Sequence, residues 1–219
     1  MGGPPRKLRD NAVACSVSRD GSWVVLQANY SELGVGYREM WIMRPDGGQP
    51  RRLYEGDQNI AFAGAEWSPD GQRLSFELVQ RAGDRVGWKM VTRDVKGGPA
   101  VTVIPGGVED QAWSPDGRII YSLDDPGPLT GSCNYWGIRI DARTGKPMEA
   151  PKRLTNWAGF CMDSSSPTAD GKLLAFEDVV QELVPRLQDI QHLHRLLQNL
   201  RIDPGRVQIA PCDRLHRMT

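Results

Sequence analysis

Side chains that could act as nucleophiles or acids occur along the chain, but none is spaced for catalysis. The serine run at 164–166 lacks the G-x-S-x-G pattern of a nucleophile elbow, and we interpret it as a polar loop before a strand. The carboxyl pair Asp124 and Asp125 precedes Pro-Gly-Pro at 126–128, a composition typical of turns. We therefore expect no catalytic residue in this chain and no enzyme activity.

Metal and cofactor ligands are equally sparse. His192 and His194 are two residues apart and would point to different sides of a helix. Cys212 and His216 are four residues apart but have no second pair with zinc spacing. There is no calcium-loop pattern and no glycine-rich phosphate cradle. We predict no metal site and no cofactor.

A repeated ten-residue stretch is the strongest signal in the sequence. WSPDGQRLSF at 67–76 returns as WSPDGRIIYS at 113–122 and, with more changes, as VSRDGSWVVL at 17–26 and SPTADGKLLAF at 166–176. The four Asp-Gly pairs are 50, 46 and 54 residues apart. A period in this range indicates a propeller or a similar array of repeated units.

Each copy of the stretch has the chemistry of a tight turn. Proline fixes φ at the second turn position, aspartate can accept hydrogen bonds from its own backbone, and glycine accepts a positive φ. We predict a structural role for these turn residues, which are Asp20, Gly21, Asp70, Gly71, Asp116, Gly117, Asp170 and Gly171.

The residues around each turn follow the period of two that is typical of strands. After the second turn, Leu74, Phe76 and Leu78 share one face, and Arg73, Ser75 and Glu77 share the other. Third strands are predicted at 38–44, 87–95 and 134–141, and fourth strands at 51–56, 100–106 and 152–157. Four strands per unit of about 50 residues, without a helix, describe one propeller blade. A β-sandwich has similar hairpins but no reason to repeat at this period.

Two of the four cysteines are neighbours within the repeat. Cys133 opens the third strand of the third unit, and Cys161 lies just before the fourth hairpin. A disulfide between them would suit an oxidising compartment. Two buried free thiols would suit the same positions, and the sequence leaves both alternatives open. Cys15 and Cys212 have no evident partner.

The turn motif, a strand such as WIMRPDGG and then RRL or KRLT together resemble the TolB-type propeller repeat, a relative of the WD-type repeat. The resemblance covers residues 10–176 and implies an all-β fold, an incomplete β-propeller of about three to four four-stranded blades. Such propellers occur in the Tol translocation protein TolB, in prolyl-oligopeptidase-like enzymes, and in bacterial kinases and winged-helix regulators. The family suggests a periplasmic or extracytoplasmic location, but no secretory signal is visible, so the location stays unassigned.

Composition changes abruptly after Phe176. All 16 aromatic residues lie at or before Phe176, and only one of the 24 glycines follows it. We expect a disordered start at 1–9, propeller blades at 10–176 and a non-repeat tail at 177–219. Apolar residues spaced by three and four predict a short α-helix at about 184–200. The tail is either a helix that caps the blades or docks a partner, or foreign, out-of-frame sequence.

The overall composition narrows the function. The formal net charge is zero, which argues against nucleic-acid binding, and no apolar run reaches the ~18–20 residues of a membrane span. The resemblance implies a non-catalytic module that binds a protein or peptide partner. The alternative is an accessory or sensor propeller of a larger enzyme or regulator, such as a Ser/Thr kinase, a prolyl-oligopeptidase-like peptidase or a winged-helix regulator.

The partner-facing rim is expected at the longest loops, 29–38 and 124–133, because loops at blade ends carry binding residues. An incomplete propeller also leaves a strand edge unpaired, which predicts edge-to-edge self-association.

Overall fold

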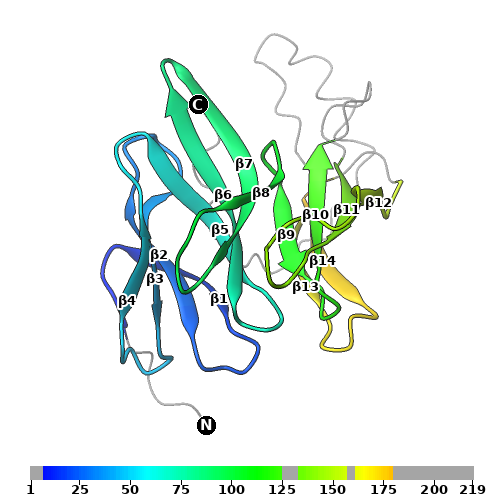
Figure 1. Cartoon of the computed structure of the whole chain (residues 1–219), viewed down its shortest axis with the longest axis horizontal. Helices are drawn as coiled ribbons and strands as arrows, with labels where there is room; N and C mark the ends of the chain where they lie inside the picture. Colours follow the sequence, from blue (N-terminus) through cyan, green and yellow to red (C-terminus); the bar gives the residue numbers. More distant parts are fainter. Residues whose placement is uncertain (1–6, 125–132, 157–160, 180–219) are drawn as a thin grey trace, which may run out of the picture.

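The computed structural model describes residues 7–124, 133–156 and 161–179, which form antiparallel β-strands joined by turns (Figure 1). Within these ranges there is no helix, and hence no apolar helix of membrane-spanning length. The helix expected at 184–200 lies outside the described residues.

The strands follow one another in units of four. The first blade contains β1 (Ala12–Val17), β2 (Val24–Tyr30), β3 (Tyr37–Met43) and β4 (Arg51–Glu55). The second contains β5 (Ile60–Trp67), β6 (Arg73–Ala82), β7 (Arg85–Asp94) and β8 (Val101–Ile104). The third contains β9 (Asp110–Trp113), β10 (Arg118–Asp124), β11 (Cys133–Arg139) and β12 (Lys152–Arg153). The described part of the fourth contains β13 (Cys161–Pro167) and β14 (Leu174–Val179).

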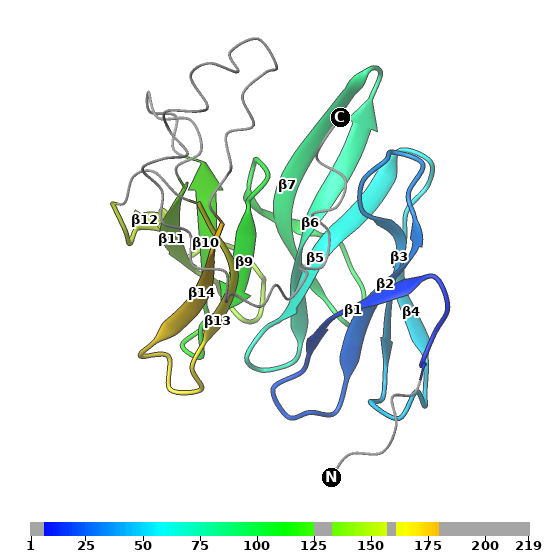
Figure 2. The same ribbon diagram turned by 180° about the vertical axis from the view of Figure 1, so that it is seen from behind.

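Backbone pairing lies almost entirely within the blades, although one residue pair makes the first two blades a single eight-stranded sheet. Each strand pairs with the next one in its own blade, and a single residue pair, Tyr37 with Phe62, joins the first blade to the second. The first strands of successive blades contact one another, β1 with β5, β5 with β9 and β9 with β13 (Figures 1 and 2). The described chain is therefore an incomplete all-β propeller of three full blades and half of a fourth.

The repeated turns join the first two strands of each blade. In the first, Asp20 Oδ1 accepts hydrogen bonds from Ser18 Oγ at 2.6 Å and from the Ser22 amide at 3.0 Å. These bonds, the one from Ser18 most of all, lower the pKa of Asp20 from 3.8 to about 2. The glycine that follows has φ of 71°, which side chains other than hydrogen tolerate poorly.

Both faces of β6, in the second blade, are buried over Arg73–Glu77. Leu74 and Phe76 of β6 pack in a core with Met40 and Tyr54 of the first blade. The opposite face of β6 carries polar side chains, yet Arg73 is only 6% exposed and Ser75 is fully buried. The polar face is buried because β6 lies between two neighbouring blades, and its polar groups must find partners there.

Polar contacts also join the first strands of successive blades to one another. Gln111 Nε2 donates to the Gly64 carbonyl at 2.6 Å, linking the third blade to the second. The Ser165 amide donates to Asp110 Oδ2 at 2.8 Å, linking the fourth blade to the third. The serine run at 164–166 lies in β13, so the polar loop expected from the sequence is wrong: the strand needs polar side chains to contact its neighbour.

Candidate functional site

A buried arginine of the second blade holds a turn of the third. Arg73 Nε donates to the Ala142 carbonyl at 2.8 Å, and Arg73 Nη2 donates to the Arg143 carbonyl at 2.6 Å. Thr92 Oγ1 donates to the Gly145 carbonyl at 2.7 Å. Three backbone carbonyls of the turn between β11 and β12 are thus bound by side chains of β6 and β7.

The held turn is shaped for close approach. Gly145 has φ of 72°, and a Cβ there would collide with the side chains of Arg73 and Thr92. Asp141 Oδ1 accepts hydrogen bonds from the hydroxyl and the amide of Thr144 at 2.8 and 2.6 Å. These bonds, the one from the hydroxyl first, lower the pKa of Asp141 and fix the turn in a compact conformation.

The first blade binds the second near the end of its third strand, through side chains of β4. Tyr54 Oη donates to the Asp94 carbonyl at 2.8 Å, and Arg51 Nη1 donates to the Val95 carbonyl at 3.1 Å. Burial raises the pKa of Tyr54 to about 12, so its hydroxyl stays protonated and remains a donor. In both interfaces, side chains of one blade bind backbone carbonyls of the next blade, at the end of its third strand or in the turn that follows it.

The third blade has a surface equivalent to the one formed by Arg73 and Thr92, and no turn of the described residues covers it. Arg118 is the first residue of β10, as Arg73 is of β6, and each pairs with the last residue of the third strand. Gly137 and Thr92 both lie two residues before the end of that strand. Arg118 and Gly137 line a groove of about 390 Å³.

The floor of the groove is apolar. It is formed by Ile120, Gly137 and Leu154, and Leu154 is 54% exposed. The strand register makes Leu154 the equivalent of Leu53, because the preceding arginines pair with equivalent tryptophans of the third strands. Leu53 packs into the core between the first two blades. The side chain that seals one interface is therefore left exposed in the groove.

The rim of the groove is charged and adaptable. Arg118 lies 3.2 Å from Asp116 and 3.9 Å from Glu149, and Lys152 lies 3.3 Å from Glu149. Ion pairs this exposed contribute at most about 1 kcal/mol each. Arg118 can therefore exchange its carboxylate partners for the carbonyls of a bound chain at little cost.

Some of the turn residues predicted from the sequence line the groove, and others lie elsewhere. Asp116, Asp170 and Gly171 line the groove, whereas the turns at 20–21 and 70–71 belong to the first and second blades. Of the expected rim, the segment 29–38 covers the end of β2, the β2–β3 connection and the start of β3 in the first blade, and none of its residues lines the groove. Residues 125–132 lie outside the described part. Sequence reasoning missed Arg118 and Leu154 as site residues. For Leu154 a signal was available, because RRL at 51–53 and KRL at 152–154 match between units.

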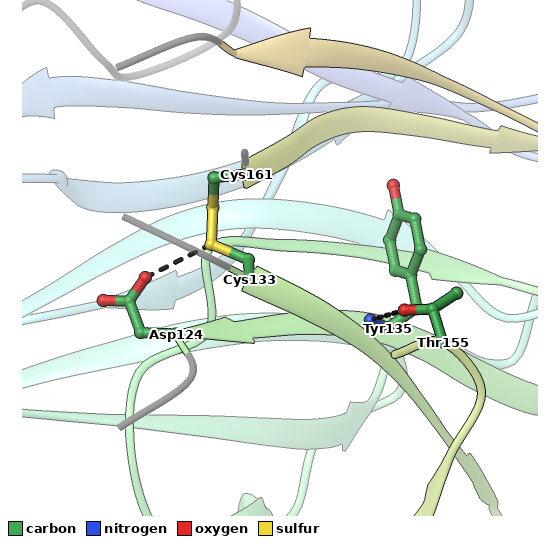
Figure 3. Close-up of a disulfide and its surroundings, with 5 residues drawn as sticks. All are labelled: Asp124, Cys133, Tyr135, Thr155 and Cys161. Atoms are coloured by element: carbon green, nitrogen blue, oxygen red, sulfur yellow. Dashed lines mark hydrogen bonds between the residues drawn. A yellow bond between two sulfur atoms is a disulfide. The ribbon is translucent and has the colours of Figure 1, made fainter. Parts of the chain in front are cut away.

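A disulfide joins Cys133 of β11 to Cys161 of β13 (Figure 3). Their Cα atoms are 4.5 Å apart, and both residues are buried. Of the two alternatives that the sequence leaves open, the structure contains the bridge, which ties the fourth blade to the third at the end of β11 opposite Arg139, away from the groove. Asp124 Oδ1 lies 3.2 Å from Cys133 Sγ, but disulfide sulfurs are not thiolates, so these three residues do not form a metal site.

Comparison with solved structures identifies the fold. Over 81% of its length the chain matches a putative TolB from Agrobacterium tumefaciens, with a TM-score of 0.52 and 18% identity, covering 56% of that chain. A prolyl endopeptidase structure matches over 78% of this chain, with a TM-score of 0.54 and 15% identity, covering 26% of its own length. An oligogalacturonate lyase from Vibrio parahaemolyticus matches over 80%, with a TM-score of 0.52 and 9% identity, covering 47% of its own length.

These similarities show the fold, which is that of a TolB-like partial β-propeller. The chain spans about half, or less, of the length of the structures it matches. No family model and no curated protein matches the sequence.

Proposed function

We propose that this TolB-like partial β-propeller is a non-catalytic recognition module, and that it binds a protein or peptide partner in the groove of the third blade. One observation carries the proposal. At the equivalent place in the second blade, Arg73 and Thr92 bind the backbone of a polypeptide turn. The groove presents Arg118 in the position of Arg73.

The size and lining of the groove suit a short peptide segment. Its volume of about 390 Å³ falls within the roughly 300–1,000 Å³ of ligand pockets. The guanidinium of Arg118 offers donors to backbone carbonyls, and Ile120 and Leu154 offer an apolar surface to one side chain. Because backbone carbonyls are common to all sequences, the apolar floor is the part that would select among partners.

Catalysis has little support in the described residues. The described residues contain no histidine, so they supply no imidazole base of their own for the activation of a hydroxyl group. A panel of peptide and ester substrates is expected to show no turnover above buffer.

Peptide selection tests the binding function. A random peptide library displayed on phage would be selected on the wild-type chain, and enriched peptides would be measured against variants. Gly137→Leu fills the groove and Arg118→Glu reverses its charge, and both are expected to abolish binding. Val86→Asp, on the exposed tip of the β6–β7 hairpin, is the control that should bind normally. Peptides that bind both groove variants as well as wild type would refute the proposed site.

A second candidate function is supported by the prolyl endopeptidase structure, of which the chain matches 26%. Here the propeller is an accessory or sensor part of a larger enzyme or regulator, and the groove holds another part of that protein. The apparent mass of the native protein, detected with an antibody against the blades, separates the two. A species well above the 24.3 kDa of this chain would favour the accessory function.

A further inference from the structure

Three side chains of metal-binding type meet where the third blade joins the fourth. Asp124 is the last residue of β10, and Cys133 and Cys161 are the first residues of β11 and β13. Asp124 pairs with Cys133 across the β10–β11 ladder, and the bridge brings Cys161 to the same point (Figure 3). The two sulfur atoms and one carboxylate oxygen lie within 4.8 Å of one another, and no other residues described in the structure gather three such atoms.

The disulfide alone does not account for the carboxylate beside it. Asp124 Oδ1 lies 3.2 Å from Cys133 Sγ, but a bridged sulfur has neither a proton to donate nor a charge to neutralise. In the reduced chain, the Cys133 thiol has a proton that it can donate to this oxygen, and a thiolate and a carboxylate can bind the same cation. The position of Asp124 therefore suits the reduced pair of cysteines better than the bridged pair.

Two thiolates and one carboxylate form a ligand set that suits zinc. Thiolate sulfur favours Zn²⁺ and Cu⁺, whereas Mg²⁺ and Ca²⁺ prefer oxygen ligands, and carboxylate oxygen is a common ligand of Zn²⁺. Zinc holds thiolates at about 2.3 Å, which places two sulfurs of a tetrahedral site roughly 3.8 Å apart. The metal and the disulfide therefore exclude each other, and three protein ligands leave the fourth position of the ion to water.

We propose that, when the bridge is reduced, Cys133, Cys161 and Asp124 bind one Zn²⁺ ion, which links the third blade to the fourth in place of the disulfide. A dithiol reductant supplies the two electrons and two protons that open the S–S bond, and is itself oxidised to a disulfide. Zn²⁺ then displaces the proton of each cysteine thiol to solvent, and Asp124 binds as the carboxylate. The inference is independent of the groove and of its proposed peptide partner.

The site has a use in either redox environment. Cysteine pairs form disulfides in oxidising compartments, and in reducing ones they more often bind metal or take part in catalysis. The same two cysteines would join the blades through a covalent bond in the first case and through zinc in the second. The bridge is the one disulfide of the described residues, so its loss without replacement would leave this junction to noncovalent contacts.

Metal content of the oxidised and reduced chain tests the site. The chain would carry Cys15→Ala and Cys212→Ala, so that the two bridge cysteines supply the only thiols, and a phosphine would be the reductant because it adds no thiol that competes for zinc. After dialysis against Zn²⁺, mass spectrometry of the metal is expected to find one ion per reduced chain and none per oxidised chain. Co²⁺ in place of zinc should give thiolate-to-cobalt charge-transfer absorption, and zinc should raise the melting temperature of the reduced chain only.

The carboxylate ligand is tested separately from the cysteines. Asp124→Asn can still form the bridge, so its fold is checked first in the oxidised chain. In the reduced chain it should bind zinc about tenfold or more weakly than the parent. The matched control is Asp84→Asn, an exposed aspartate between β6 and β7, which should bind zinc like the parent. Cys133→Ser and Cys161→Ser should each lose tight binding.

Four outcomes would overturn the proposal. The first is a reduced, folded chain that takes up no zinc. The second is equal zinc binding by the oxidised and reduced chains, which would assign the metal to other ligands, such as the histidines at 192–216. The third is Asp124→Asn binding as tightly as the Asp84→Asn control, because the carboxylate would then not be a ligand. The fourth is a reduced chain that circular dichroism shows to be unfolded and that zinc does not refold.

Discussion

Replacing Arg73 with alanine should weaken the contact between the second and third blades far more than replacing Arg118. The two arginines occupy the same position in successive blades. Arg73 is 6% exposed and donates to two turn carbonyls, whereas the Arg118 side chain is 44% exposed and meets carboxylates at the surface. Position and residue type are matched, and the burial of the guanidinium and its partners is what differs.

The magnitude follows from the two buried hydrogen bonds. Bonds made by a charged group contribute about 1.5–3 kcal/mol each, and removing the guanidinium recovers part of its desolvation cost. We expect Arg73→Ala to lower the free energy of unfolding by about 2–4 kcal/mol. Arg118→Ala should change it by no more than about 1 kcal/mol.

Urea unfolding, followed by tryptophan fluorescence and by far-ultraviolet circular dichroism, measures both variants. Two probes are needed because stacked repeats can unfold in steps. Hydrogen exchange adds a local test: Arg73→Ala should speed exchange of the Gly145 amide, which donates to the Asp141 carbonyl in the turn. Equal losses of stability for the two arginine variants, or unchanged exchange at Gly145, would show that the buried arginine does not hold the blades together.

Three other predictions concern the bridge, the turns and the core. Reducing the bridge between Cys133 and Cys161, which are 28 residues apart, should lower the free energy of unfolding by about 3–4 kcal/mol; an unchanged urea midpoint in reductant would contradict this. The folded pKa of Asp20, about 2, lies below its ordinary value of 3.8, so its ionised form stabilises the fold above pH 4 and this contribution is lost between pH 4 and pH 2. Asp20→Asn should therefore have a lower melting temperature than wild type at pH 7, with the difference shrinking toward pH 2, and a constant difference would count against the turn hydrogen bonds. Phe76→Ala removes a ring that is 1% exposed and should cost about 3–5 kcal/mol in urea unfolding, against no more than about 0.5 kcal/mol for Val86→Ala at the hairpin tip.

The sequence predicts the blades because their signals are local. The Ser-Pro-Asp-Gly turns and the aromatic residues before them mark the end of the first strand at Trp67 and Trp113, where the structure has it. The fourth strand predicted at 152–157 is shorter in the structure, where β12 covers only Lys152–Arg153. That strand is at the outer edge of its blade, where pairing depends on neighbours and not on residue type.

The groove could not be predicted from local pattern. Arg73 and Arg118 look alike in the sequence, each following an Asp-Gly turn. Their difference comes from the next blade, which places a turn over Arg73 and leaves Arg118 at an open surface. The polar face of β6 looks solvent-exposed in the sequence for the same reason. The alternation shows which residues share a face, but it does not show whether another blade covers that face.

The contacts that one blade makes to the residues after the third strand of the next blade are one-sided in a way that matters for how such a protein can change. The donors are particular side chains, Tyr54, Arg51, Arg73 and Thr92, but the acceptors are backbone carbonyls. For this contact, a following blade needs a turn of suitable shape with glycine at the close approach, and it needs no matching side chain. Gene duplication or deletion of a whole unit would therefore preserve the turn contact at a new junction, and compensating substitutions would be needed only at side-chain pairs such as Trp113 Nε1 with Ser75 Oγ.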